Sequence, residues 1–297
     1  MQRDHLARGA LLMLAAGFLF ASTGALVKHV AVALPNEMVV FVRNLIGLLA
    51  LVPWLLHRGP RYFATRKPGA HLVRALAGLA AMYCYFYAIA RLPLAEAVLL
   101  NYSSPLFIPL AALLWVGEGF NRRLWWPIGI GFVGIAFILK PGLSLLAPIA
   151  LLGLAAGVFS ALAMAGIRRL TQTEPATRVV FYFSLVSTVV SAVPLAWSWQ
   201  TPAPGMWVAL VMVGVLSTAA QILMTRAYAQ APAAQVGPFM YGTVVFAALF
   251  GWAFWSEIPD WLSLVGVLLV AAAGMLTIRI GGQQAAPPAE LPDSTAR

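Results

Sequence analysis

The chain has 297 residues, of which 62% are hydrophobic and only 9% are charged. A soluble domain carries about 25% charged residues, so this composition cannot cover a water-facing surface. The net charge of +10 does not indicate nucleic-acid binding, because the 19 basic residues are scattered between apolar runs. We therefore expect an all-α integral membrane protein that contacts membrane lipid and has no nucleic-acid partner.

Ten segments are long and apolar enough to span a bilayer, whose core of about 30 Å requires about 20 residues per helix. In chain order they are 8–30, 37–56, 70–90, 94–116, 124–140, 146–167, 177–199, 205–228, 233–255 and 260–280. The short gaps between them leave no room for a sizeable soluble domain. The tail at 282–297 is rich in Pro, Ala and polar residues and is expected to be disordered.

The two halves of the chain repeat one another. At spacings of 139 or 140 residues the following less common residues form pairs: Pro35 and Pro175, Pro93 and Pro232, Tyr102 and Tyr241, Glu118 and Glu257. The sequence thus predicts one five-helix repeat over 1–140 and a second over 145–281. Because five is odd, the second repeat must enter the membrane from the opposite side, and the repeats are inverted.

Basic residues also define a topology. One side of the predicted membrane collects fifteen of them, and the other side has only Lys28, Arg91 and Lys140. Positively charged loops stay in the cytoplasm, so both termini are expected there. Inverted repeats recur in secondary transporters, because two related halves can exchange conformations around a central site.

The repeated segments carry a resemblance to a known family. The first reads PLAEAVLLNYSSPLF and the second PAAQVGPFMYGTVVF, and each is followed by a glutamate, with Lys28, Pro35 and Arg43 around the first two helices. This ordered set, over roughly residues 8–280, resembles the EamA family of the drug/metabolite transporter superfamily. Within it, the chain is most similar to bacterial amino-acid exporters of the YddG type. One departure is that Pro105 has Val244 opposite it, while Pro238 comes earlier in the second copy.

The resemblance implies a multi-pass protein of the bacterial inner membrane. It would export small zwitterionic or moderately apolar metabolites, amino acids above all, by alternating access between the repeats and without a cofactor. A lipid carrier or a nucleotide-sugar carrier stays open as an alternative. An intramembrane enzyme is disfavoured, because paired Asp clusters, an HExxH motif and a deep histidine base are all missing from the sequence.

Candidate substrate-binding residues are the polar and aromatic side chains at membrane depth on the third, fourth, eighth and ninth helices. They are Tyr83, Tyr87, Asn101, Tyr102, Ser104, Gln221, Thr225, Met240, Tyr241 and Thr243. Candidate hinges are Pro105, Gly237 and Pro238, because proline frees a backbone carbonyl and bends a helix. Each has a simpler alternative: hydroxyls that bond their own backbone, amides that join helices, and tyrosines that anchor at the interface. Gly153 and Gly157 form a GxxxG that predicts close helix packing.

Charged residues are informative mainly by their absence. The nine acidic residues and four histidines fall at or beyond the predicted helix ends, so the sequence shows no evident proton-coupling site and favours a facilitator or an unusual coupling. Arg43 is predicted to be the one deep charge. It either binds a substrate carboxylate or extends outward and pairs with Glu37 or a neighbour. A single deep charge favours a nearly neutral substrate, and Lys28 is a second possible charged participant.

The topology is testable with reporter fusions at residue 297. We expect a cytoplasmic reporter to be active and a periplasmic reporter to be silent, because of the bias in basic residues. A fusion active only in the periplasm would contradict the assigned orientation.

Overall fold

The structure is a computed structural model and describes residues 2–59, 64–107, 122–139, 148–171, 173–230 and 237–284. Within these ranges every regular element is a helix. In chain order they are α1 (Gln2–Val30), α2 (Asn36–Arg58), α3 (Pro68–Ile89), α4 (Leu94–Asn101), η2 (Arg122–Leu124), α6 (Trp125–Leu139), α7 (Pro148–Thr171), α8 (Ala176–Ala192), α9 (Leu195–Ser198), α10 (Pro204–Gln230), η3 (Gly237–Tyr241), α12 (Gly242–Trp255) and α13 (Trp261–Gln284).

Length and composition suit these helices to a membrane. In the described chain, five are long and apolar enough to cross a bilayer: Ala7–Val30, Asn36–Pro53, Pro68–Ile89, Pro148–Ile167 and Pro204–Met224. Three shorter apolar helices cover Thr177–Ala192, Phe239–Trp255 and Trp261–Thr277. Large apolar side chains such as Trp126, Val208 and Leu268 point outward from the bundle. The chain is therefore a multi-pass membrane protein.

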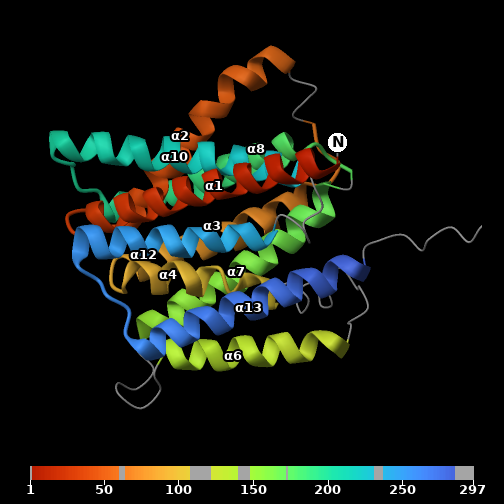
Figure 1. The fold of residues 1–297 in the computed structure, drawn as a ribbon. Coiled ribbons are helices and arrows are strands. Elements are labelled where there is room, and N and C mark those ends of the chain that lie inside the picture. The colour runs from red at the N-terminus through yellow and green to blue at the C-terminus, as the bar shows by residue number, and fades with distance from the viewer. Residues whose placement is uncertain are drawn as a thin grey trace, which may run out of the picture.

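The long helices lie side by side in one bundle, and α1 and α3 lie near its centre (Figure 1). Helix α1 packs against α10 and α12, α3 packs against α7, and α6 packs against α13. The start of α1 and the end of α13 lie at the same end of the bundle (Figure 1). We call this the N-terminal end, and the end where α1 stops and α2 begins is the opposite end.

Helix α4 is interrupted inside the bundle. It ends at Asn101, a turn covers Tyr102 and Ser103, and helix resumes at Ser104. Pro105 explains the interruption, because it has no N–H to donate to the carbonyl of Asn101 and disfavours helical geometry at the residue before it. The remainder of the predicted 94–116 helix beyond residue 107 lies outside the described ranges.

The corresponding part of the second half changes its helical geometry without an interruption. Within the predicted 233–255 helix, the 3-10 turn η3 passes directly into α12 after Tyr241. The Tyr241 hydroxyl donates a hydrogen bond of 3.3 Å to the backbone carbonyl of Tyr102, its counterpart in the predicted repeat. This side chain thus satisfies a carbonyl that the interrupted ladder of α4 leaves free.

Three helix boundaries differ from the sequence predictions. The 177–199 helix stops at Ala192, because Pro194 cannot continue it, and α9 follows as a separate short turn. The 146–167 helix continues to Thr171. Helix α13 continues to Gln284, three residues into the predicted tail, whose residues 285–297 lie outside the described chain. The ten-helix arrangement in two repeats stays a prediction, since 108–121 and 140–147 are also outside it.

Glycines on α7 allow the interrupted segment to approach closely. A Cβ added at Gly157 would lie 2.5 Å from Ser103 Oγ and 2.6 Å from the carbonyl oxygen of Leu100. A Cβ at Gly153 would lie 2.7 Å from Leu100 Cδ1. The predicted close packing at this GxxxG is confirmed, and its partner is the broken segment of α4.

The packing predicts a difference between two glycines. We expect Gly157→Ala to lower the melting temperature of the detergent-purified protein, because the added methyl meets a backbone oxygen that cannot move aside, and overpacking costs about 1–3 kcal/mol. Gly129→Ala is the matched control, since nothing lies within 4 Å of its added Cβ. If the two variants have the same melting temperature, the contact at Gly157 is not tight.

Candidate functional site

A cavity of about 210 Å³ lies inside the bundle, between helices of both halves. Its walls come from α1, α2, α3 and α4 in the first half and from α7, α8, α10 and η3 in the second. The lining includes Asn101, Tyr102, Ser104, Gln221, Met240 and Arg43, all of which the sequence nominated. Three of these residues, from Asn101 to Ser104, belong to the interrupted segment of α4. The break therefore presents polar groups to the cavity.

The aromatic wall comes from a different face of α3 than the sequence predicted. Tyr85 and Phe86 line the cavity, whereas Tyr83 and Tyr87 are not among the lining residues. Tyr83 and Tyr87 are four residues apart and share one face, and Tyr85 lies between them on the other. The assignment of Tyr83 and Tyr87 to this wall is wrong by half a turn.

Tyr83 and Tyr87 have other surroundings. The carbonyl of Tyr83 accepts a hydrogen bond of 3.0 Å from the Asn36 amide, and its hydroxyl is buried. The Arg91 guanidinium carbon lies 3.6 Å from the centre of the Tyr87 ring, near the opposite end of the bundle. Tyr87 therefore fits the alternative of an anchor near the membrane surface.

A second charged residue lies deep in the bundle, on the face of α3 that lines the cavity. Arg74, Gly78, Ala81, Met82 and Tyr85 follow one another at helical spacing along this wall. Arg74 is buried, although the sequence analysis counted it among the basic residues outside the membrane. Because α3 already begins at Pro68, Arg74 lies almost two turns inside the helix. The prediction of Arg43 as the one deep charge is therefore wrong.

Arg43 is held by neighbours on two helices. Its Nε donates to Ser217 Oγ at 3.2 Å, and its Nη1 donates to Asn44 Oδ1 at 2.9 Å. Its side chain lines the cavity and is 5% exposed, so it does not extend outward to pair with Glu37. Arg43 thus faces the cavity and also bonds to two neighbours, so a substrate-binding role and a structural role both stay open.

Arg74 has fewer hydrogen-bond partners than Arg43. Its guanidinium carbon lies 4.0 Å from the centre of the Phe183 ring, and Arg43 lies 5.8 Å from the same ring. The Nε and Nη1 atoms of Arg74 are buried without a hydrogen-bond partner. Among the described lining residues there is no carboxylate. The cavity thus contains two buried positive charges without a carboxylate among its described lining residues, an arrangement that is costly unless the charges are paired.

Amides and hydroxyls complete the polar wall. Asn101 Oδ1 accepts a hydrogen bond of 2.8 Å from Ser160 Oγ of α7, so this amide joins two helices and also faces the cavity. Thr218, next to the cavity stripe of α10, donates to the backbone carbonyl of Gly214 at 2.8 Å. For Thr218 the simpler alternative of a hydroxyl bonded to its own helix is confirmed.

Of the remaining nominated residues, Tyr241 and Thr243 lie away from the cavity wall. Tyr241 contacts the break in α4 and lies against Gly274 of α13, where an added methyl would overlap its hydroxyl. Thr243 is buried against Gly17 of α1, 2.8 Å from where a Cβ on that glycine would lie. Gly237 belongs to η3, and the side chains of Thr225 and Pro238 fall outside the described part of the chain.

Lys28 belongs to a polar cluster at the opposite end. Its Nζ forms an ion pair with Glu257 Oε1 and donates to the carbonyl of Leu92 at 2.6 Å. The other oxygen of Glu257 accepts from the backbone N–H of Leu94 at 2.7 Å. This cluster ties α1, the start of α4 and the segment after α12 together, so Lys28 joins the two halves outside the cavity.

A second pocket, of about 270 Å³, opens near that end and is lined by Asn36, Glu37, Tyr87 and Arg91 among others. Phe86 lines both this pocket and the central cavity, and it is the residue that the two described linings share. Phe86 therefore contacts both the cavity and a pocket toward the opposite end.

A cavity that combines polar and apolar side chains inside an apolar helical bundle is typical of a membrane transporter. Comparison with known proteins agrees and is more specific. The sequence model of the EamA-like transporter family matches residues 7–140 and again 147–279. The chain belongs to the EamA-like transporter family.

Three curated relatives cover nearly the whole chain. The pseudopaline exporter CntI of Pseudomonas aeruginosa strain UCBPP-PA14 is 38% identical over 276 residues, covering 92% of this chain and 96% of the relative. A riboflavin transporter of Vibrio cholerae is 28% identical, covering 91% and 93%. An S-adenosylmethionine uptake transporter of Rickettsia bellii is 25% identical, covering 84% and 86%. All are transporters of small metabolites, and this chain is one as well.

A solved crystal structure shares the fold. It is similar with a TM-score of 0.63 and 21% sequence identity, covering 94% of this chain and 98% of the other. At this identity the likeness concerns the fold alone.

Proposed function

We propose that this protein exports an amino acid, or a related metabolite with a free carboxylate, across the bacterial inner membrane by alternating access. The observation that carries the proposal is the pair of buried guanidinium groups, Arg43 and Arg74, in a cavity whose described lining has no carboxylate. Guanidinium groups bind carboxylates through paired, charge-assisted hydrogen bonds. A bound carboxylate would neutralise the charge and give Arg74 the partner that it lacks.

The rest of the wall suits the other parts of such a molecule. The carbonyl oxygens of Asn101 and Gln221 and the hydroxyl of Ser104 can accept hydrogen bonds from an ammonium group. Phe20, Tyr85, Phe86, Met82 and Met240 provide apolar and aromatic surface for a side chain. An amino-acid zwitterion is nearly neutral, as the sequence predicted, and it also offers the two arginines a carboxylate.

The direction and orientation belong to the same proposal. Export is supported by the 38% identity with a protein named as an exporter, although more distant relatives are named for uptake. The basic residues at the N-terminal end support cytoplasmic termini. The cavity lies between the two halves, where carriers built from inverted repeats bind substrate.

The arginines provide the first test. In proteoliposomes, labelled amino acids should be carried by the wild type, and unlabelled compounds should compete only when they carry a carboxylate. Arg74→Gln should reduce this flux about tenfold or more, since a hydrogen bond to a charged group is worth about 1.5–3 kcal/mol. Its melting temperature without substrate should not fall, because Arg74 has buried nitrogens without partners.

Two further comparisons make that result decisive. Arg66→Gln, an exposed basic residue just before α3, should transport normally. Decarboxylated analogues that compete as well as the amino acids would contradict a carboxylate site, and competition by nucleotide sugars alone would favour that class of carrier instead.

The amides provide a separate test. Asn101→Ala and Gln221→Ala should each lower the flux and the thermal stabilisation by transported amino acids while changing the substrate-free melting temperature little. A contact that only joins helices is worth about 0.6 kcal/mol in a membrane protein, and its loss would lower stability and flux in proportion. Thr218→Ala is the control, because Thr218 lies three residues before Gln221 on α10 and its hydroxyl is bonded to the backbone of its own helix. Normal flux per folded molecule in both amide variants would remove these residues from the site.

A further inference from the structure

A groove of about 610 Å³ lies on the outside of the bundle between α6 and α13, apart from the central cavity. Its lining consists of Trp125, Trp126, Gly129, Ile130, Val133 and Leu269. The lining residues that belong to α6 are all exposed. Because the surface of a membrane-spanning bundle is covered by lipid, an apolar groove on it is accessible to acyl chains.

Glycine keeps this groove open. Nothing lies within 4 Å of a Cβ added at Gly129, so there is open space beside this residue. Gly134 instead faces α13, because a Cβ added there would lie 2.8 Å from Leu269 Cβ and 2.9 Å from the carbonyl oxygen of Gly266. The two helices therefore touch closely at Gly134, while the exposed face of α6 at Gly129 is hollow.

The contact at Gly134 also fixes the relative direction of the two helices. The turn η2, which precedes α6, packs against α13 as well. If the helices were parallel, residues ten or more positions before Gly134 would lie level with the chain before α13 begins at Trp261. The helices are therefore antiparallel, and the start of α6 lies beside the end of α13 at the N-terminal end (Figure 1).

Three exposed arginines gather at this end of the groove. Arg123 precedes Gly134 by eleven residues and Arg279 follows Leu269 by ten, so the two lie at about the same height. Arg122 is one helical turn before Trp126, on the stripe of residues that lines the groove. Neither Arg122 nor Arg279 forms an ion pair with another residue in the described part of the chain.

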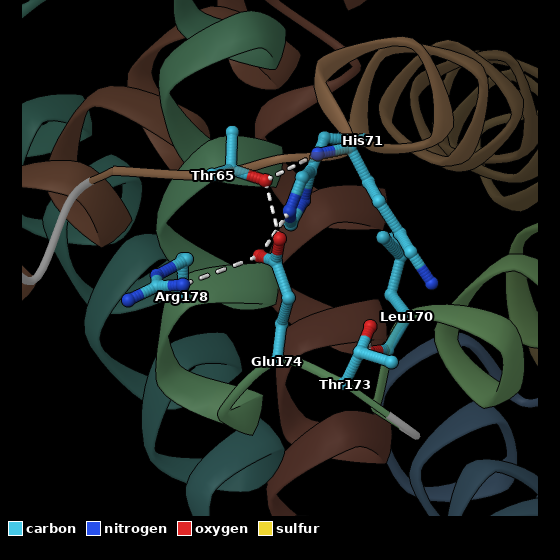
Figure 2. Close-up of polar contacts among 7 residues, drawn as sticks. Thr65, His71, Leu170, Thr173, Glu174 and Arg178 are labelled. Carbon is cyan, nitrogen blue, oxygen red and sulfur yellow. Dashed lines mark hydrogen bonds and ion pairs between the residues drawn. The ribbon is translucent and has the colours of Figure 1, made fainter.

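Another arginine at the same end is compensated within the protein. Arg178 lies 3.7 Å from the carboxylate of Glu174 in the connection between α7 and α8. That carboxylate also accepts a hydrogen bond from Thr65 and lies 2.7 Å from Nε2 of the buried His71 (Figure 2). Helices α6 and α13 contain no acidic residue, so the positive charge beside the groove is directed to the membrane surface.

The dimensions of the groove fit one leaflet of a bilayer. About ten residues separate the arginines from Val133, which corresponds to about 15 Å of helix. This is half of an apolar membrane core of about 30 Å. The groove therefore has the depth of one acyl chain, and its two tryptophans lie just below the charges, where tryptophan is enriched at membrane interfaces.

We propose that this groove is a binding site for an anionic phospholipid of the leaflet at the N-terminal end. The phosphate binds at the three arginines, because guanidinium groups form paired, charge-assisted hydrogen bonds with phosphate. One acyl chain lies in the groove against Trp126, Gly129 and Val133. Basic pockets between transmembrane helices bind the head groups of anionic lipids in this way. The site goes beyond the proposed transport function and does not depend on it.

The test uses the full chain, purified in a neutral detergent, with phosphatidylglycerol as the probe. Phosphatidylglycerol should raise the melting temperature until the site is saturated, because a ligand that binds only the folded protein stabilises it. Phosphatidylcholine with the same acyl chains should raise it much less. Glycerol phosphate, which has the charge without an acyl chain, should not raise it.

Two variants separate the arginines from the groove. Arg122→Gln combined with Arg279→Gln should increase the phosphatidylglycerol concentration at half-maximal stabilisation about tenfold or more. Gly129→Phe should also increase it without changing any charge, because the added ring occupies the open space. Arg66→Gln combined with Arg169→Gln is the control, since it removes the same charge from exposed positions on other helices and should leave this concentration unchanged. All of these residues are exposed, so the melting temperatures without lipid should stay near that of the wild type.

Three results would overturn the proposal. Equal stabilisation by the two phospholipids, or an equal loss in the control, would mean that the arginines act only as general surface charge. An unchanged concentration in Gly129→Phe would mean that the lipid binds elsewhere. Native mass spectrometry counts the copies of the chain, and a wild-type dimer that Gly129→Phe dissociates would assign the groove to a second copy of the protein.

Discussion

The constraint on which the structure depends is that backbone polar groups inside an apolar slab must find partners within the protein. Helix α4 is nevertheless interrupted inside the bundle, at Tyr102 and Ser103. The carbonyl of Tyr102 finds its partner in the other half of the chain, through the hydrogen bond from the Tyr241 hydroxyl. Glycine 157 lets α7 approach the same segment. These contacts hold the interrupted backbone in place, and the cavity forms where the regular helix is missing.

Unlike these backbone contacts, the charges in the cavity do not stabilise the empty protein. Two buried guanidinium groups near one phenylalanine ring are poorly compensated when nothing is bound, and removal of a charge from water is unfavourable unless it is paired. At the ends of the bundle, by contrast, basic residues form ion pairs with carboxylates: Lys28 with Glu257, and Arg178 with Glu174. Positive charge is paired where the halves contact each other and is left available where a ligand would bind.

The membrane class, the family and six of the residues that line the cavity could be predicted from the sequence. Asn101, Ser104 and Gln221 could be predicted because an amide or hydroxyl within an apolar run stands out. The fourth and eighth helices also contain few other polar residues. Arg74 was missed because it lies near a helix start, where a basic residue is usually a topology signal. The spacing from Arg74 through Gly78 and Ala81 to Tyr85 was the available clue to its orientation.

Other features could not be read from one sequence. The choice between Tyr85 and its neighbours in the run YCYFY depends on the rotation of α3, which packing against α7 and α8 determines. The pairing of His71 with Glu174 joins residues 103 positions apart and requires the tertiary arrangement. Helix interruptions depend on prolines, but where the freed carbonyl finds its partner is also a tertiary property.

The two halves are not built alike around this contact. The first half has a regular helix of eight residues before its interruption, while the described second half has a five-residue 3-10 turn that runs into α12, and Pro105 has Val244 as its counterpart in the predicted repeat. If the halves exchange shapes, as the proposed alternating access requires, identical halves would make the inward-facing and outward-facing states equal in free energy. Unequal halves would give the empty carrier a preferred resting state, and each 1.4 kcal/mol or so of difference changes the population ratio about tenfold. The difference between the halves would then set the side to which the empty cavity is open.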